Sequence, residues 1–188
     1  MDELIITKEM LDDFLREQGE CFELVDGSIK PSDIPFDWNS SLELEEMGEF
    51  ESIEKEAAEL LSHFKNCYVS IPVCEITEEV AIILSKHEGQ LVLNELCECE
   101  LSKLAAESLS QYKGRLSLRL DEFNDFYASI FSNSECDLEL CGFDEISDTT
   151  AQLIAKKKNG DLVFHNLAGV NDAVAESLSN FSGGTLGL

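Results

Sequence analysis

Six alanines recur at a fixed place in a repeating pattern, and this recurrence constrains the fold more than any other feature of the chain. Each alanine lies five residues after an apolar residue, here called the anchor, and three residues before a large apolar residue. The anchors are Ile53, Ile76, Leu101, Phe123, Ile146 and Val170, the alanines are Ala58, Ala81, Ala106, Ala128, Ala151 and Ala175, and the large apolar residues are Leu61, Leu84, Leu109, Phe131, Ile154 and Leu178. Successive anchors are 22 to 25 residues apart, a period typical of stacked repeats.

A short run of alternating apolar residues precedes each anchor. The clearest runs are Leu91-Val92-Leu93 and Leu116-Ser117-Leu118, and each follows a glycine, Gly89 or Gly114. Equivalent runs begin at Leu42, Val69, Leu138 and Leu162. Alternation over a few residues between turn signals predicts a short β-strand in each repeat.

A short helix is predicted after each anchor. The next residues are Glu54, Thr77, Ser102, Asn124, Ser147 and Asn171, and five of these six are good N-cap residues. Thirteen residues after an anchor lie Asn66, Gly89, Gly114 and Gly183, with Gly160 one residue later in the fifth repeat. Because glycine and asparagine tolerate the left-handed conformation, we expect them to close helices of roughly ten residues. We interpret each alanine as the point where the helix backbone passes close over its neighbours.

One such repeat cannot bury its own apolar face, so neighbouring repeats must stack and share a core. The fold class expected is therefore α/β, with short strands in a parallel sheet and one helix per repeat. The unit resembles the leucine-rich repeat over residues 41–188, through its L-x-L strands, the following Leu96, Phe143 and Leu167, and the alanine and leucine positions of each helix. This resemblance implies a right-handed α/β solenoid of six repeats. The chain departs from the family in having apolar residues where an asparagine ladder is usual.

The two ends differ from the middle. Residues 1–40 do not fit the repeat, and we expect them to form an acidic N-terminal cap with a helix at 8–18, a strand at 21–25 and an irregular segment up to Trp38. Thr7 is the expected N-cap of that helix. Residues 185–188 predict a partial seventh strand. Because an uncovered strand edge favours association, a homodimer through this edge is one expectation.

Charge and cysteine content narrow the classes of partner and compartment. The formal charge of −26 repels nucleic acid and anionic membranes, so we expect neither as a partner. The first ten residues have no basic segment followed by an apolar one, so no signal peptide is expected. Seven cysteines, an odd number spread through core-like segments, favour a reducing cytoplasm over a disulfide framework.

No catalytic or metal-binding pattern is evident. Cys97 and Cys99 form the closest cysteine pair, but no second pair or histidine pair lies at the spacing of a zinc site. His63 and His87 fall near helix ends, where a structural role is expected. We therefore expect no enzyme activity, no metal and no cofactor. An enzyme that uses spatially adjacent cysteines and histidines stays open as an alternative.

The outward positions of the predicted strands are the candidate binding surface, and they form three columns. The first column is Ser41, Tyr68, Gln90, Arg115, Asp137 and Asp161, the second is Glu43, Ser70, Val92, Ser117, Glu139 and Val163, and the third is Glu45, Pro72, Asn94, Arg119, Cys141 and His165. Arg115 and Arg119 lie near the middle with acids on both sides. From these columns we select as partner-binding residues Tyr68, Gln90, Asn94, Arg115, Arg119, Asp137, Glu139, Asp161 and His165.

The leading hypothesis is a cytoplasmic, non-catalytic protein-interaction module that uses this strand face. The alternative is an acidic inhibitor or immunity-type protein that neutralises a basic partner or mimics nucleic acid. A run of glutamates at 43, 45, 46, 49 and 51 lacks the spacing of a calcium loop and is expected to be a solvated surface, and the alternative predicts that its neutralisation abolishes binding. The two hypotheses differ in which surface binds and in how strongly salt weakens binding.

Overall fold

The computed structural model describes residues 5–17, 23–25, 28–30, 41–96 and 101–188. The strands are β1 (Ile5–Ile6), β2 (Glu23–Val25), β3 (Ser28–Lys30), β4 (Ser41–Glu43), β5 (Ser52–Ile53), β6 (Lys65–Ile71), β7 (Glu88–Leu93), β8 (Arg115–Arg119), β9 (Asp137–Cys141), β10 (Leu162–Phe164) and β11 (Leu186–Gly187). The helices are α1 (Lys8–Glu17), α2 (Lys55–Ser62), α3 (Glu78–Leu84), α4 (Lys103–Leu109), α5 (Asp125–Phe131), α6 (Asp148–Ile154) and α7 (Asp172–Leu178), with a 3₁₀ turn η1 at Leu44–Met47.

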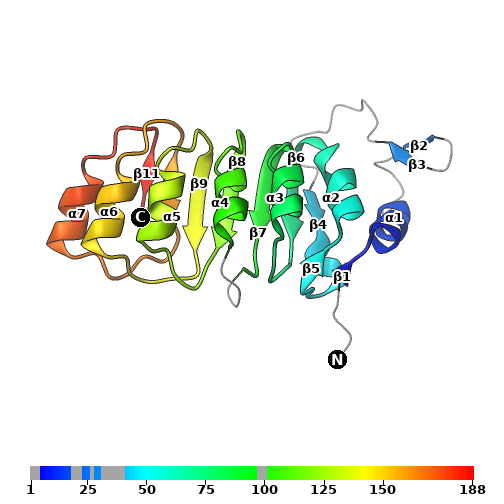
Figure 1. Ribbon diagram of the computed structural model, residues 1–188, viewed down its shortest axis with the longest axis horizontal. Coiled ribbons are helices and arrows are strands. Elements are labelled where there is room, and N and C mark those ends of the chain that lie inside the picture. The colour runs from blue at the N-terminus through cyan, green and yellow to red at the C-terminus, as the bar shows by residue number, and fades with distance from the viewer. Residues whose placement is uncertain (1–4, 18–22, 26–27, 31–40, 97–100) are drawn as a thin grey trace.

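Seven of the described strands form one parallel sheet in the order β11-β10-β9-β8-β7-β6-β4. The register aligns the repeats as the L-x-L runs predict, because Leu91 pairs with Leu116, Leu116 with Leu138 and Leu138 with Leu162. One helix separates each strand from the next along the chain from β4 to β11, and Figure 1 shows α2 to α7 in a row on one face of the sheet. The α/β class is therefore confirmed.

The five N-caps predicted for the repeat helices are all confirmed. The side chains of Thr77, Ser102 and Ser147 accept from backbone N–H groups at 3.3, 3.2 and 3.0 Å. Asn124 and Asn171 do the same at 3.1 and 2.9 Å. Glu54 makes no side-chain cap on α2. The helices α3 to α7 contain seven residues, fewer than expected.

The repeat alanines lie where neighbouring helices pack together. The first five alanines, from Ala58 to Ala151, are fully buried, whereas Ala175 on α7 is exposed. Helix α7 is the last described helix, and no further described helix packs beyond it. The interpretation of the alanines as points of close packing between repeats is thereby confirmed.

The predicted role of the glycines was wrong. The C-cap residues of α3 to α7 are all right-handed, with φ near −60°, and the glycines lie several residues further along. The chain leaves each of these helices through tight turns such as His87 N–H to the Leu84 carbonyl at 3.0 Å. The glycines are needed because the backbones of adjacent repeats approach too closely for a Cβ. A Cβ on Gly114 would collide with the carbonyl oxygen of Gly89, and a Cβ on Gly89 with that of Cys67.

Residues 5–17 follow the repeat frame, contrary to expectation. Ile6 pairs in parallel with the anchor Ile53, and Thr7 caps α1 by accepting from the Met10 N–H at 3.2 Å. Leu11 and Leu15 on α1 are buried. Helix α1 therefore continues the helical row beyond α2 (Figure 1). Leu11 lies five residues after Ile6, where the other repeats have an alanine. The helical row therefore includes α1, although the alanine pattern in the sequence begins only at α2.

The other predicted end features are confirmed in part. The strand expected at 21–25 appears as β2, which pairs antiparallel with β3. Most of the rest of the expected cap lies outside the described residues. The expected partial seventh strand is β11, which pairs in parallel with β10 and ends the sheet order.

Candidate interaction site

The strand face consists of the outward columns that the register brings together. Tyr68 pairs with Gln90, Gln90 with Arg115 and Arg115 with Asp137, so the first predicted column is continuous across the sheet. The middle column is not accessible at its centre. Ser70, Val92 and Ser117 are buried although they alternate outward, because the longer side chains of the first and third columns flank them. The accessible surface at the centre of the sheet is therefore made by residues of the two outer columns such as Arg115 and Arg119, whereas Pro72 of the third column is buried.

Two arginines stand at the centre of this face. The chain has three arginines, and Arg115 and Arg119 lie on the same strand, β8, which is the middle strand of the seven-stranded order. Both side chains are exposed. Arg115 lies 3.4 Å from the Glu139 carboxylate, and His165 Nε2 lies 3.6 Å from the same carboxylate. Within the described residues Arg119 makes no ion pair, so its guanidinium remains available to a partner.

The predicted residues on the N-terminal side of the arginines form a polar network. The Ser70 hydroxyl donates to the Glu45 carboxylate. Asn94 Nδ2 donates to Glu45 at 2.5 Å and to the Ser70 hydroxyl at 2.9 Å. Tyr68 is half-buried, and this burial raises the pKa of its phenol. These residues hold one another in place and extend a hydrogen-bonding surface from β8 toward β4.

Asp137 and Asp161 have structural roles at the starts of the strands. Asp137 Oδ1 accepts from the Asp161 N–H at 2.9 Å, and Asp161 Oδ1 accepts from the Thr185 N–H at 2.6 Å. Each carboxylate thus satisfies a backbone donor of the following repeat, which an aspartate side chain does readily. Both residues had been selected as partner-binding residues. Their hydrogen bonds to the following repeat give both residues a structural role in linking adjacent repeats.

The described thiols are buried or half-buried, and the described imidazoles lie apart in the sequence at His63, His87 and His165. Among the described residues, no cluster of three His, Cys, Asp or Glu side chains is placed to hold a metal ion. Burial raises the pKa of Cys67 to about 11 and raises those of Cys136 and Cys141, which keeps these thiols protonated and weakly nucleophilic. Cys97 and Cys99 lie outside the described residues. His63 is exposed and His87 is buried.

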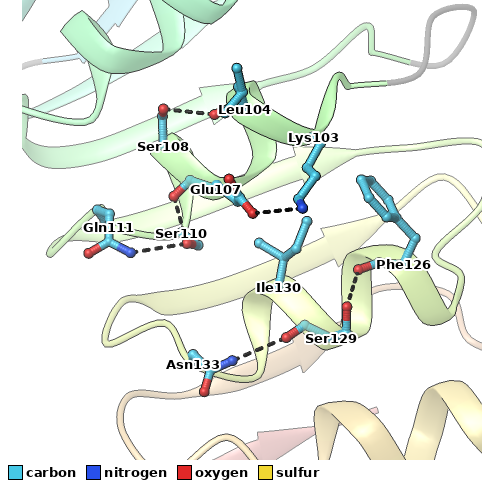
Figure 2. Close-up of a pocket in the computed structure, with 10 residues that line it drawn as sticks. All are labelled: Lys103, Leu104, Glu107, Ser108, Ser110, Gln111, Phe126, Ser129, Ile130 and Asn133. Atoms are coloured by element: carbon cyan, nitrogen blue, oxygen red, sulfur yellow. Dashed lines mark hydrogen bonds and ion pairs between the residues drawn. The ribbon is translucent and has the colours of Figure 1, made fainter.

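A groove between α4 and α5 was not anticipated from the sequence. It has a volume of about 770 Å³ and is lined by Lys103, Leu104, Glu107, Ser108, Ser110, Gln111, Phe126, Ser129, Ile130 and Asn133. In Figure 2, Phe126 and Ile130 rise from α5 toward Lys103 and Glu107 on α4. The α4–α5 pair packs less closely than the α3–α4 or α5–α6 pair. The residue before the alanine is Ala105 in α4 but the much larger Tyr127 in α5, and both are buried.

The exposed residues of this groove had a signal in the sequence. Leu104 and Phe126 both lie three residues after an anchor and are 52% and 42% exposed. The same position in the other four repeats holds Glu56, Glu79, Thr149 and Ala173. Two large apolar residues in adjacent repeats, at a place where the others are polar or small, mark a local change in surface character.

A second groove adjoins the first at Phe126, which lines both. Its volume is about 860 Å³, and its lining includes five carboxylates, Asp121, Glu122, Asp125, Asp144 and Glu145, together with Phe123 and Phe143. Asp125 is fixed in place because the Thr150 hydroxyl donates to it at 2.6 Å. The helix face therefore carries an apolar groove that opens at one end onto an acidic one.

Comparison with known proteins adds no assignment. No family model, no curated protein and no solved structure matches this chain. Within the described residues, no helix is both long enough and apolar enough to cross a bilayer.

Proposed function

We propose that this chain is a leucine-rich-repeat-like, right-handed α/β solenoid that works as a non-catalytic protein-interaction module. Each repeat contributes one strand and one helix, and adjacent repeats make in-register parallel pairs. Parallel strands joined through a helix are right-handed in nearly all known cases. Phe143, which takes the position of a ladder asparagine in the family this unit resembles, stacks instead on the anchor Phe123 with ring centroids 5.9 Å apart.

The observation that carries the proposal is the position of Arg115 and Arg119. They are exposed on the central strand of a chain with a formal charge of −26. A guanidinium matches a carboxylate in a planar, two-point contact, so this pair favours an acidic or carbonyl-rich segment of a partner protein. The surrounding carboxylates repel partners that do not present such a group at the centre. We place the module in the cytoplasm, because a reducing compartment suits the free thiols of Cys67, Cys74, Cys136 and Cys141.

Charge reversal at the two arginines tests this function. Wild-type protein, the R115E/R119E variant and a K86E/K156E control are immobilised, and the proteins that each captures from a cell lysate are quantified by mass spectrometry. Lys86 and Lys156 are exposed, occupy the same repeat position and change the net charge equally. The captured amount of a specific partner should fall at least about tenfold with R115E/R119E and should be unchanged with the K86E/K156E control. Equal capture by both variants would contradict the strand-face proposal.

The acidic-inhibitor alternative is supported by a different surface. Glu43, Glu45, Glu46, Glu49 and Glu51 are all exposed in the first repeat. Their replacement by glutamine should abolish capture of a basic partner, and about 0.5 M NaCl should do the same by screening. A partner that survives R115E/R119E but is lost under both of these conditions would favour the inhibitor. A partner insensitive to both would exclude it.

A further inference from the structure

The groove between α4 and α5 lies on the helix face, on the opposite side of the sheet from the arginines of the strand face. Of the five large hydrophobic residues that are exposed among the described residues, Leu104 and Phe126 lie on the adjacent helices α4 and α5 and line this groove. Ile130 on α5 is partly buried beside them. A cluster of this kind, next to two helices that pack loosely, is typical of a surface that a partner covers.

We propose that this groove binds a basic amphipathic segment of a second protein, with an apolar side chain against Phe126 and Ile130 and lysine or arginine against the adjoining carboxylates. The binding site is distinct from the strand face, so one molecule would hold two partners at once.

The apolar contact follows from what the groove presents. Phe126 and Ile130 are one helical turn apart on α5 and point toward α4 (Figure 2). Opposite them, Lys103 and Glu107 form an ion pair at 3.6 Å, which uses the one cation that lines either groove. The ion pair occupies part of the α4 side, and Leu104, Phe126 and Ile130 are left with apolar surface that a partner side chain can cover.

The serines of the groove indicate which polar groups a partner should present. The Ser108 hydroxyl donates to the Leu104 carbonyl at 2.7 Å, and the Ser129 hydroxyl donates to the Phe126 carbonyl at 2.8 Å. Because these hydrogens are used within the helices, the hydroxyl oxygens face the groove as acceptors. The polar atoms that complement them are N–H donors, such as those of lysine and arginine.

The charge of the partner follows from the second groove. Asp121, Glu122, Asp144 and Glu145 are exposed around it, with Asp125 held in place between them and the first groove. Carboxylates this close together repel one another, and a bound cationic partner reduces that repulsion. The negative potential of the carboxylates also attracts such a partner during its approach. The same charge argues against a second copy of this chain as the occupant, since each copy carries −26.

A displayed peptide library tests the proposal with a defined probe. Random peptides of about 16 residues, long enough for four helical turns, are selected on the wild-type chain after removal of those that bind the L104S/F126S variant. The expected consensus has apolar residues three or four positions apart and lysine or arginine between them. The control variant M10S/I82S changes two residues of similar exposure, 37% and 49%, outside the groove. Circular dichroism confirms that both variants are folded.

Enriched peptides are then measured by fluorescence polarisation. Binding should weaken at least tenfold with L104S/F126S, at least threefold with E122Q/D144N, and less than twofold with M10S/I82S. No enrichment, an acidic or uncharged consensus, or equal binding to L104S/F126S would overturn the proposal. Dimerisation of the wild type that L104S/F126S abolishes would also overturn it and assign the groove to a second copy. The R115E/R119E variant should bind these peptides normally, so failure of the strand-face function leaves this result interpretable.

Discussion

One position in each repeat is buried yet differs widely in chemistry. It lies eleven residues after the anchor and holds Phe64, His87, Tyr112, Ser134, Lys157 and Phe181. The first five are buried, and two of the polar members, Tyr112 and Lys157, donate hydrogen bonds to the repeat before them. Tyr112 donates to the Gly89 carbonyl at 3.0 Å, and Lys157 Nζ donates to the carbonyl and hydroxyl of Ser134 at 2.9 and 3.1 Å. The desolvation of Lys157 lowers its pKa.

His87 in this column makes the stability of the fold depend on pH. Neither ring nitrogen makes a hydrogen bond of good geometry among the described residues, and burial lowers the pKa of His87 below its ordinary value of 6.5 despite the nearby backbone groups of Cys67, Leu61 and Phe64, which raise it. The unfolded chain therefore binds a proton at a higher pH than the folded chain does. Consequently the free energy of unfolding decreases as the pH falls from about 6.5 toward the lower folded pKa.

The substitution His87→Phe should remove this dependence. Phenylalanine occupies the same position in the first and sixth repeats, so the ring fits the column. We expect the free energy of unfolding of the variant at pH 7 to be about 1 kcal/mol higher than that of the wild type, since two unsatisfied buried nitrogens are lost. Urea unfolding of the variant, the wild type and an exposed control, His63→Phe, across pH 5 to 7.5 checks this. A variant with the pH slope of the wild type would show that His87 is not its source.

Gly114 tests the close approach of adjacent repeats. We expect Gly114→Ala to lower the free energy of unfolding by about 3 kcal/mol or more, because the new methyl group would collide with the Gly89 carbonyl. The matched control is Gly48→Ala, where no atom lies within 4 Å of the added Cβ and the cost comes from a φ of +118° alone. That cost should be about 1–2 kcal/mol. Thermal or chemical unfolding measures both, and equal losses would refute the collision.

At the scale of elements, the buried alanines limit how closely the helices pack. We expect Ala81→Leu in α3 to lower the free energy of unfolding by about 2–3 kcal/mol, because extra methylenes must fit between closely packed helices. Ala175→Leu in α7 should change it by less than about 0.5 kcal/mol, since this alanine is exposed. Urea unfolding of the two variants gives the comparison. Similar losses at both sites would mean that helix propensity, and not contact with a neighbour, explains the alanines.

The helix starts show how reliably an element is encoded by neighbouring residues. Five predicted N-caps are present with hydrogen bonds of 2.9 to 3.3 Å, because a cap needs only residues within three positions of one another. The helix ends were predicted less well. Glycine was expected there on local grounds, whereas the close approach that requires it involves a residue one whole repeat away, as between Gly114 and Gly89.

For the whole molecule, charge repulsion opposes the compact state. The formal charge is −26, and ion pairs such as Lys55–Glu79 and Lys8–Asp12 lie at the surface, where each contributes little. Added salt screens the repulsion over distances longer than those of the pairs. Raising NaCl from about 20 mM to about 500 mM should therefore raise the Tm by about 3 °C or more.

Differential scanning calorimetry measures this rise. The variant with glutamine at the five positions Glu43, Glu45, Glu46, Glu49 and Glu51 should show a smaller increase, because part of the repulsion has been removed. A Tm that falls with salt would mean that the ion pairs outweigh the net charge.

The sequence by itself determined the repeat, the α/β class, the strand register and the outward columns. Periodicity, alternation and capping are relations between residues within one repeat or at one fixed offset, so they can be read directly. The position of Arg115 and Arg119 on one strand was found in this way.

Only the tertiary structure decided which of these positions a partner could reach. Ser70 and Val92 are outward but buried, Ala175 follows the pattern but is exposed, and Ile6 extends the sheet pairing of the first repeat. The groove at Phe126 likewise depends on how loosely α4 and α5 pack together. The burial of a residue and the distance between two helices depend on the neighbours that pack against them. A repeat pattern predicts where a side chain lies but not which neighbour covers it.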